Sequence, residues 1–141
     1  ICDREHSAED ALKTVENTAE NLDMHLIYMN ADDHDIHTAY ISHISHITSY
    51  ALANTVLEKE REEDTIFQLA STGFSSTVRL AKSHPEMWVP IFKQNKENVL
   101  DVLNEHISQL RKFKSALEKE NYDLLEDLIR NANKIRGILD K

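Results

Sequence analysis

Apolar residues recur every three or four positions along most of the chain, which is the spacing of amphipathic helices. The pattern predicts a first helix over about residues 8–21, opened by Ser7 and Asp10 as a capping box. A much longer helix is predicted over about 33–60, because nothing in that stretch breaks it. The polar run that starts at Asn30 offers N-caps for this second helix.

The other segments are shorter. The apolar run 25–29 is compatible with a five-residue strand. Short helices are expected before and after Gly73, because glycine interrupts the helical pattern there. Pro85 suits the first turn of a following helix, and Pro90 should kink that helix or delay its regular part. The dominance of helical spacing predicts an all-α fold.

Two long helices at the C-terminal end carry apolar seams. No breaker lies within 91–118, and Asn121 can cap a last helix after it. The seam residues alternate four- and three-residue steps: Val99, Leu103, His106, Leu110, Phe113 and Leu117, then Leu125, Leu128, Ala132, Ile135 and Leu139. The seams could pack within one chain or between two copies. Because long helices in 141 residues leave more apolar surface than so small a globule covers, we expect an obligate homodimer.

Composition narrows the fold further. The chain has two glycines and two prolines, where average usage would give about ten and about seven. Nucleotide-binding α/β folds and β-sandwiches use glycine in turns and phosphate loops. A self-contained Rossmann, P-loop or sandwich domain is therefore not expected in this chain.

Charge and hydropathy exclude two classes of partner. The net charge of −9 repels phosphate backbones, so nucleic-acid binding is not expected. No apolar run is long enough to span a membrane. The single cysteine, Cys2, cannot form an internal disulfide and fits a cytoplasmic location. The sequence opens with Ile1, so we expect a processed product or a piece of a longer chain.

Four of the eight histidines fall within residues 34–46, which raises the question of a metal site. At about 100° per residue, His34 and His37 point to one side of a helix and His43 and His46 to the other. One metal ion cannot be reached from both sides, and no HExxH motif accompanies them. No metal is therefore expected.

The same helical geometry places His43 in the middle of a predicted buried stripe and His46 at its border. The stripe consists of Ile36, Tyr40, Ile47, Tyr50 and Asn54. One interpretation is a hydrogen-bonded core histidine. The alternative is a polar surface that binds something, because Ser42 and other hydroxyl residues surround the two histidines.

Two strings of residues resemble the helical domain of prephenate dehydrogenases. The first is similar to the family's "HD…A…SHLPH" signature: His34-Asp35, Ala39 and Ser42-His43-Ile44-Ser45-His46. The second is similar to its "GF…TRLA…P.(M/L)W..I…N" string: Gly73-Phe74, Thr77-Val78-Arg79-Leu80-Ala81, Pro85-Glu86-Met87-Trp88, Ile91 and Asn95. The match covers roughly residues 33–100 in detail, and the later helices agree in pattern only.

The resemblance implies a fold and an activity. Members of the family join an NAD-binding Rossmann domain to an all-helical domain that intertwines with its twin in a dimer. They oxidise prephenate with NAD, with loss of carbon dioxide, to 4-hydroxyphenylpyruvate in tyrosine biosynthesis. On this basis, residues 1–30 would be the tail of the nucleotide-binding domain and residues 31–141 the helical domain for dimerisation and substrate binding.

The resemblance also implies site residues. Arg79 would hold a substrate carboxylate, and His46 would lie near the ring hydroxyl with Ser42 and His43 beside it. No catalytic or cofactor-binding residue is expected in this chain, because the family's proton acceptor belongs to the nucleotide-binding domain. Without the motif, Arg79 would be interpreted as a surface salt bridge.

Two departures from the family pattern stand out. Ser45 replaces a usual proline, which should leave the helix less kinked. Ser75 and Ser76 replace a commonly charged pair, so a salt bridge that orients Arg79 is in question. Trp88 is expected to be a core anchor rather than a ligand contact.

Other functions remain open at this point. A non-enzymatic helical dimer, such as an adaptor or sensor module, fits the same helices. Within the enzyme class, arogenate differs from prephenate by an amino group in place of a keto group. The sequence leaves this choice open, together with NAD against NADP and feedback inhibition by tyrosine.

Overall fold

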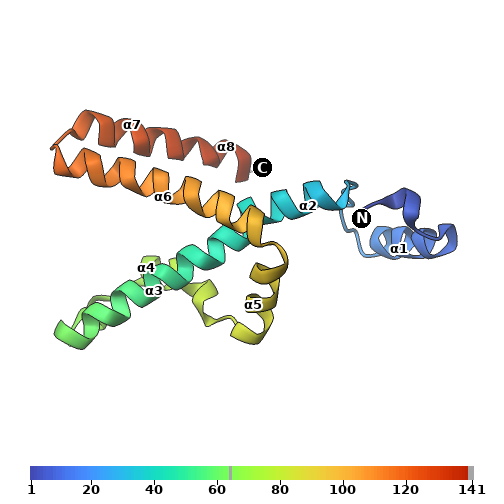
Figure 1. Ribbon diagram of the computed structural model, residues 1–141, viewed down its shortest axis with the longest axis horizontal. Coiled ribbons are helices and arrows are strands. Elements are labelled where there is room, and N and C mark those ends of the chain that lie inside the picture. The colour runs from blue at the N-terminus through green and yellow to red at the C-terminus, as the bar shows by residue number, and fades with distance from the viewer. Residues whose placement is uncertain (64, 140–141) are drawn as a thin grey trace. The chain divides into compact units, whose positions relative to one another are not determined.

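A computed structural model describes residues 1–63 and 65–139, with the side chain of residue 63 left out. The protein is all-α, as predicted, and the described residues contain no strand (Figure 1). The α-helices are α1 (Glu9–Asn21), α2 (Ala31–Thr38), α3 (Ile44–Glu63), α4 (Thr72–Thr77), α5 (Pro85–Gln94), α6 (Lys96–Glu118), α7 (Tyr122–Ala132) and α8 (Arg136–Leu139). Short 3-10 turns are η1 (Arg4–His6), η3 (Ile66–Leu69), η4 (Arg79–Lys82) and η5 (Asn133–Ile135). The chain divides into two compact units, Ile1–Val99 and a second that begins at Leu100.

Three of the predicted helix starts are confirmed. The Asn30 side chain accepts a hydrogen bond from the Asp33 amide at 2.7 Å and caps α2. The Asn121 side chain accepts from the Leu124 amide at 3.0 Å and caps α7. Pro85 occupies the first turn of α5, where its missing N–H costs no helical hydrogen bond.

The predicted capping box before α1 is wrong. Ala8 is the N-cap residue, and it makes no side-chain cap. The Asp10 carboxylate instead accepts from the adjacent Ala11 amide at 2.9 Å. Helix α1 still begins at Glu9. The acidic side chains in its first turn stabilise this start, because they lie near the positive end of the helix dipole.

The predicted strand over 25–29 does not form. A single bridge joins Cys2 to Met29, with the Asp3 amide donating to the Met29 carbonyl at 3.1 Å and the Met29 amide to the Ile1 carbonyl at 3.2 Å. The partner segment turns into η1 at once, so the remaining backbone groups of 25–29 have no strand beside them.

The helix breaks near Gly73 and Asn95 differ from the predicted ones. Gly73 lies inside the first turn of α4 and has no positive φ, so it does not interrupt a helix. The helix predicted over 91–118 divides at Asn95, between α5 and α6. Pro90, in contrast, sits inside α5. The Asn95 backbone leaves helical geometry while its side chain contacts a distant segment, which no local pattern encodes.

The long helix predicted over 33–60 is present as α2, α3 and a connecting π turn, η2 (Ala39–His43). The Ile44 amide donates to the Ala39 carbonyl, five residues back. A π turn contains one residue more than an α-helical turn and is frequent at functional sites.

The buried face of this helix differs in part from the predicted stripe. His43 and His46 are buried, but Ile36 and Tyr40 are 42% and 47% exposed, and Asn54 is also exposed. The most buried positions are the small residues Ala39 and Ser49. Small side chains allow neighbouring backbone to approach, and the Ser49 hydroxyl reaches the Thr77 carbonyl at 3.2 Å.

In the second unit, a tight turn reverses the chain after α6. The Asn121 amide donates to the Ala116 carbonyl at 2.9 Å, and Glu120 takes a positive φ of 51°. Figure 1 shows α7 and α8 running back along α6. Parts of both predicted seams stay exposed, including Leu110, Leu117, Ile135 and Leu139.

Candidate functional site

A polar pocket of about 440 Å³ lies within the first unit, between the α2–η2 segment and α5. One wall carries His34, Asp35, Thr38, Ser42 and His43, and the other carries Met87, Trp88, Ile91, Gln94 and Asn95. The pocket therefore brings together two of the four predicted site residues, Ser42 and His43. Its walls combine hydrogen-bonding groups with an aromatic surface, which suits a small polar ligand.

His43 and Asn95 are the most enclosed polar residues of this pocket, each with 8% of its surface exposed. The His43 ring packs edge-on against Trp88 and Phe92, with centroids 6.1 and 6.2 Å away. Burial lowers the pKa of His43 below the ordinary histidine value, and His46 and His34 add to this effect, whereas the Asp35 carboxylate opposes it. His43 is therefore neutral at pH 7.

This lowered pKa predicts a pH-dependent stability. The unfolded chain binds a proton at His43 below about pH 6.5, and the folded chain does so only at lower pH. The contribution of neutral His43 is thus present above about pH 6.5 and is lost as the pH falls through the folded pKa. We expect the urea midpoint to fall between about pH 7.5 and about pH 5.

The variant His43→Gln should show a smaller fall, because its amide does not titrate. Unfolding followed by circular dichroism at both pH values measures the difference. His25→Gln is the matched control, since His25 is exposed and should leave the pH dependence unchanged. If the urea midpoint falls as much in His43→Gln as in the unmodified protein, the pH dependence belongs to other groups.

His46 lies beside the pocket rather than in its lining. It is buried, and its ring stacks on Trp88 with centroids 3.4 Å apart and planes 27° apart. His46 Nδ1 lies 3.0 Å from the Ser42 carbonyl. Since a carbonyl only accepts, Nδ1 carries the proton, and in the neutral ring Nε2 is left as an acceptor. The Ser42 carbonyl, which belongs to the π turn, thus fixes the orientation of the His46 ring.

Arg79 is not joined to this pocket. It is exposed at the start of η4, and none of the carboxylates that the structure describes pairs with it. The surface salt bridge that an arbitrary arginine would form is thus absent from the described part of the chain. The bond from Ser49 to Thr77 holds the end of α4, just before Arg79, against α3.

Trp88 is the core anchor that the sequence predicts. It is 8% exposed and contacts His43, His46 and Phe92. It also lines a second, mostly apolar pocket of about 390 Å³ with Tyr50 and Phe92. The Tyr50 hydroxyl there is buried and finds no hydrogen-bond partner within the described residues.

The sequence did not single out Asn95 as a site residue. Asn95 is buried and lines the pocket, and its Nδ2 atom lies 3.3 Å from His43 Nδ1. Asn95 closes the second family string, and it is a polar residue inside an otherwise unbroken helical pattern, but neither signal assigned it a role. His34 and Asp35 also line the pocket, where His34 Nδ1 lies 3.0 Å from the Asp35 carboxylate.

The described residues contain neither a metal-binding cluster nor a membrane-spanning helix. Among the side chains of residues 1–62 and 65–139, no group of three or more from histidine, cysteine, aspartate and glutamate could hold a metal ion. None of the helices described is long and apolar enough to cross a membrane.

The fold and the pocket define an all-helical domain in which one of two buried histidines lines a pocket of hydrogen-bonding and aromatic side chains. Residues 30–131 match the family model described as "Prephenate dehydrogenase, dimerization domain". This range contains the pocket, both histidines and Arg79. The chain belongs to the prephenate dehydrogenase family.

Relatives of known function support the same family. The chain is 28% identical over 128 residues to prephenate dehydrogenase of Bacillus subtilis, which covers 91% of this chain and 34% of that protein. It is 27% identical over 132 residues to cyclohexadienyl dehydrogenase of Zymomonas mobilis, covering 93% of this chain and 45% of that protein. The chain thus spans less than half of the length of either relative.

A solved structure has the same fold. The crystal structure of prephenate dehydrogenase from Aquifex aeolicus, in complex with hydroxyphenyl propionate and NAD+, superimposes with a TM-score of 0.83 at 29% identity. The match covers 97% of this chain and 48% of that one.

The residues present here do not form a dinucleotide site. Such a site places glycines in a tight turn between a strand and a helix. The two glycines of this chain, Gly73 and Gly137, lie within α4 and α8, and the described residues include no strand. No step of the chemistry is therefore assigned to a cofactor held by this chain.

Proposed function

We propose that this chain is the substrate-binding and dimer-forming part of an enzyme that oxidises prephenate with NAD. Residues 1–30 would end the nucleotide-binding domain, and residues 31–141 would form the helical domain. The observation that carries the proposal is the match of residues 30–131 to the family model, since this range includes the polar pocket. The product would be 4-hydroxyphenylpyruvate, formed with loss of carbon dioxide in tyrosine biosynthesis.

The proposed reaction needs two kinds of contact from this chain. A base would take the proton of the ring hydroxyl while a hydride passes from the carbon that bears it to NAD. Loss of carbon dioxide would then make the ring aromatic, and the ring oxygen would take back a proton to give the phenol. His46 would orient and polarise the hydroxyl, because Ser42 leaves its Nε2 atom as an acceptor. The base that removes the proton is proposed to lie outside this chain.

The second contact is with the carboxylates of prephenate. A guanidinium binds a carboxylate through two parallel hydrogen bonds. Arg79 has no carboxylate partner in the described residues and is exposed, so its full set of donors is available to a ligand. Ser42 and His43 would supply further hydrogen bonds from the pocket wall.

We also propose that the chain forms a homodimer. Leu110 and Leu117 continue the seam of α6, yet they are 55% and 57% exposed. Large apolar side chains exposed in a row at coiled-coil spacing favour a helical partner. Sedimentation equilibrium should give twice the chain mass, and a monomer at micromolar concentration would overturn the dimer.

An assay of the whole protein, meaning the enzyme of which this chain is proposed to be a part, tests the proposed activity. Prephenate and arogenate are each supplied with NAD or NADP, and reduced cofactor is followed by its absorbance. Turnover of prephenate with NAD supports the proposal, and a preference for arogenate or NADP would correct the substrate or cofactor. Absence of turnover with all four combinations would favour a non-enzymatic helical dimer.

The 141-residue chain by itself is expected to bind no NAD and to show no turnover. The reason is that its residues do not build a dinucleotide site. Titration calorimetry with NAD measures this directly, with the whole protein as the positive control. Micromolar affinity of the isolated chain would show that a cofactor site exists within these residues.

A further inference from the structure

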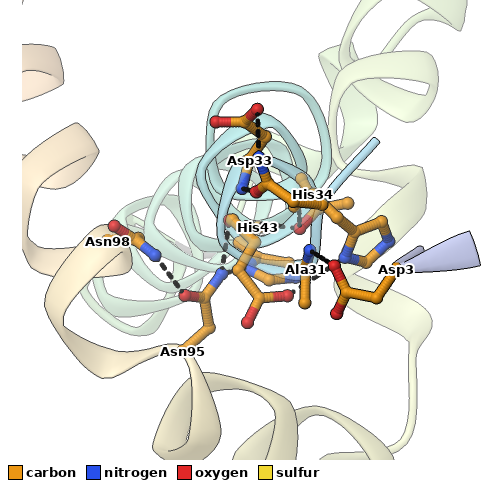
Figure 2. Close-up of polar contacts among 10 residues, drawn as sticks. Asp3, Ala31, Asp33, His34, His43, Asn95 and Asn98 are labelled. Carbon is orange, nitrogen blue, oxygen red and sulfur yellow. Dashed lines mark hydrogen bonds and ion pairs between the residues drawn. The ribbon is translucent and has the colours of Figure 1, made fainter. Parts of the chain in front are cut away.

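Asn95 makes three side-chain contacts at the break between α5 and α6. Its Nδ2 atom lies 2.7 Å from the Asp35 carbonyl and 3.3 Å from His43 Nδ1. Its Oδ1 atom accepts from Asn98 Nδ2 at 2.8 Å. Figure 2 shows the Asn95 side chain between Asn98 and His43. A buried amide that connects two segments 60 residues apart is a specific feature of this fold.

The Asp35 carbonyl fixes the orientation of this amide. A carbonyl only accepts hydrogen bonds, so the Asn95 atom that faces it must be the NH2 group. Asn98 donates to the opposite atom, which must therefore be the oxygen. Of the two Nδ2 hydrogens, one goes to Asp35 and the other is directed to His43.

The orientation of Asn95 determines which nitrogen of His43 carries the proton. His43 Nδ1 receives a hydrogen bond from a group that only donates, so Nδ1 is unprotonated. The ring proton then resides on Nε2. His46 has the opposite arrangement, because its Nδ1 atom donates to the Ser42 carbonyl. The two histidines thus carry their protons on different nitrogens.

We propose that Asn95 is a positioning residue that holds His43 as a neutral Nε2–H donor for an oxygen atom of the bound substrate. The proposal deepens the proposed function and rests on it for the identity of the substrate. His43 lines the pocket, and because Asn95 occupies its Nδ1 atom, Nε2 is the ring nitrogen left for a ligand. A ligand would therefore meet a donor at His43 and not an acceptor. This selects ligands that present a carboxylate, carbonyl or hydroxyl oxygen.

The groups around His43 agree with a neutral ring. The charged or titratable groups that act on it, Asp35, His46 and His34, all come from its own helical segment. From α5 it meets the rings of Trp88 and Phe92, and beyond α5 the amide of Asn95. A protonated Nδ1 would direct an N–H against the Asn95 NH2 group, so Asn95 opposes protonation in addition to the effect of burial.

Nitrogen NMR of the His43 ring tests the proposal without any substrate. In the whole protein at about pH 7.5, two-bond proton–nitrogen spectra distinguish a protonated from an unprotonated ring nitrogen. We expect a protonated Nε2 and an unprotonated Nδ1 at His43. A protonated Nδ1 in the unmodified protein would overturn the proposal.

The variant Asn95→Asp keeps nearly the same side-chain shape but replaces the NH2 group that donates to His43 Nδ1 with an oxygen that can only accept. Its carboxylate should accept a hydrogen bond from Nδ1–H, which moves the ring proton to Nδ1, and should raise the pKa of His43 by about 1–3 pH units. Asn98→Ala should keep the original tautomer, because the Asp35 carbonyl still orients Asn95. Val99→Ala is the control for stability alone, since it removes buried apolar volume one turn further along α6.

Activity provides a separate readout. In Asn95→Asp, the neutral His43 ring would carry its proton on Nδ1 and present an unprotonated Nε2 to the substrate. Above the raised His43 pKa, kcat/KM for prephenate should therefore fall in this variant, whereas Val99→Ala should leave its pH dependence in place. An unchanged kcat/KM together with a changed tautomer would remove His43 from substrate binding. If the whole protein does not oxidise prephenate, the proposed function fails, and the NMR result still decides whether Asn95 sets the tautomer.

Discussion

Replacing Trp88 with alanine is expected to destabilise the protein by about 3–5 kcal/mol, the usual cost of removing a buried tryptophan side chain. Trp88 is 8% exposed and lies between two histidines and a phenylalanine. The His46 ring, with its centroid 3.4 Å away, would lose the ring on which it stacks. The cavity would open beside the polar pocket, because Trp88 lines it.

Urea unfolding followed by circular dichroism measures this loss, since the variant lacks the only tryptophan of the chain. Val89→Ala is the matched control on the same helix. Val89 is 62% exposed, so its truncation should change stability by less than about 0.5 kcal/mol. Equal effects of the two substitutions would mean that Trp88 does not anchor the core.

Replacing Arg79 with alanine should raise the KM for prephenate about 10- to 150-fold in the whole protein. A charge-assisted hydrogen bond contributes about 1.5–3 kcal/mol, and each 1.4 kcal/mol is a factor of ten. The side chain is exposed and has no carboxylate partner in the described residues, so its removal should not destabilise the fold. The expectation rests on the proposed function of this arginine.

Steady-state kinetics with varied prephenate gives kcat and KM separately. Lys82→Ala is the control, because Lys82 is a second exposed cation on the same short turn, η4. It should leave the KM within about twofold of the unmodified value if the effect is specific to the guanidinium. A KM that is unchanged in Arg79→Ala would place the carboxylate contact elsewhere.

The helix starts were predictable because they depend on neighbours in the sequence. Asn30, Pro85 and Asn121 act on backbone groups within one turn, so their residue types are sufficient. The division of the helix at Asn95 was not predictable in this way. Its side chain contacts Asp35 and His43, which are 60 and 52 positions away.

The candidate site was predicted in part for a similar reason. Helical geometry identified His43 as buried, although the stripe around it was centred on the wrong side chains. Ile36 and Tyr40 are large and apolar, yet the neighbouring segments approach the small residues Ala39 and Ser49 instead. Which face of this helix is covered thus depends on where the backbone of a neighbouring segment can approach it closely, and not on hydrophobicity alone.

The π turn has a consequence for how this helix is compared with others. Because η2 (Ala39–His43) holds one residue more than a regular turn, a relative with an uninterrupted α-helix would be one residue shorter between α2 and α3. Aligning the two without a gap would pair every residue on one side of the turn with the wrong counterpart. A single-residue gap placed within the turn would bring both His34 and His46 back into correspondence.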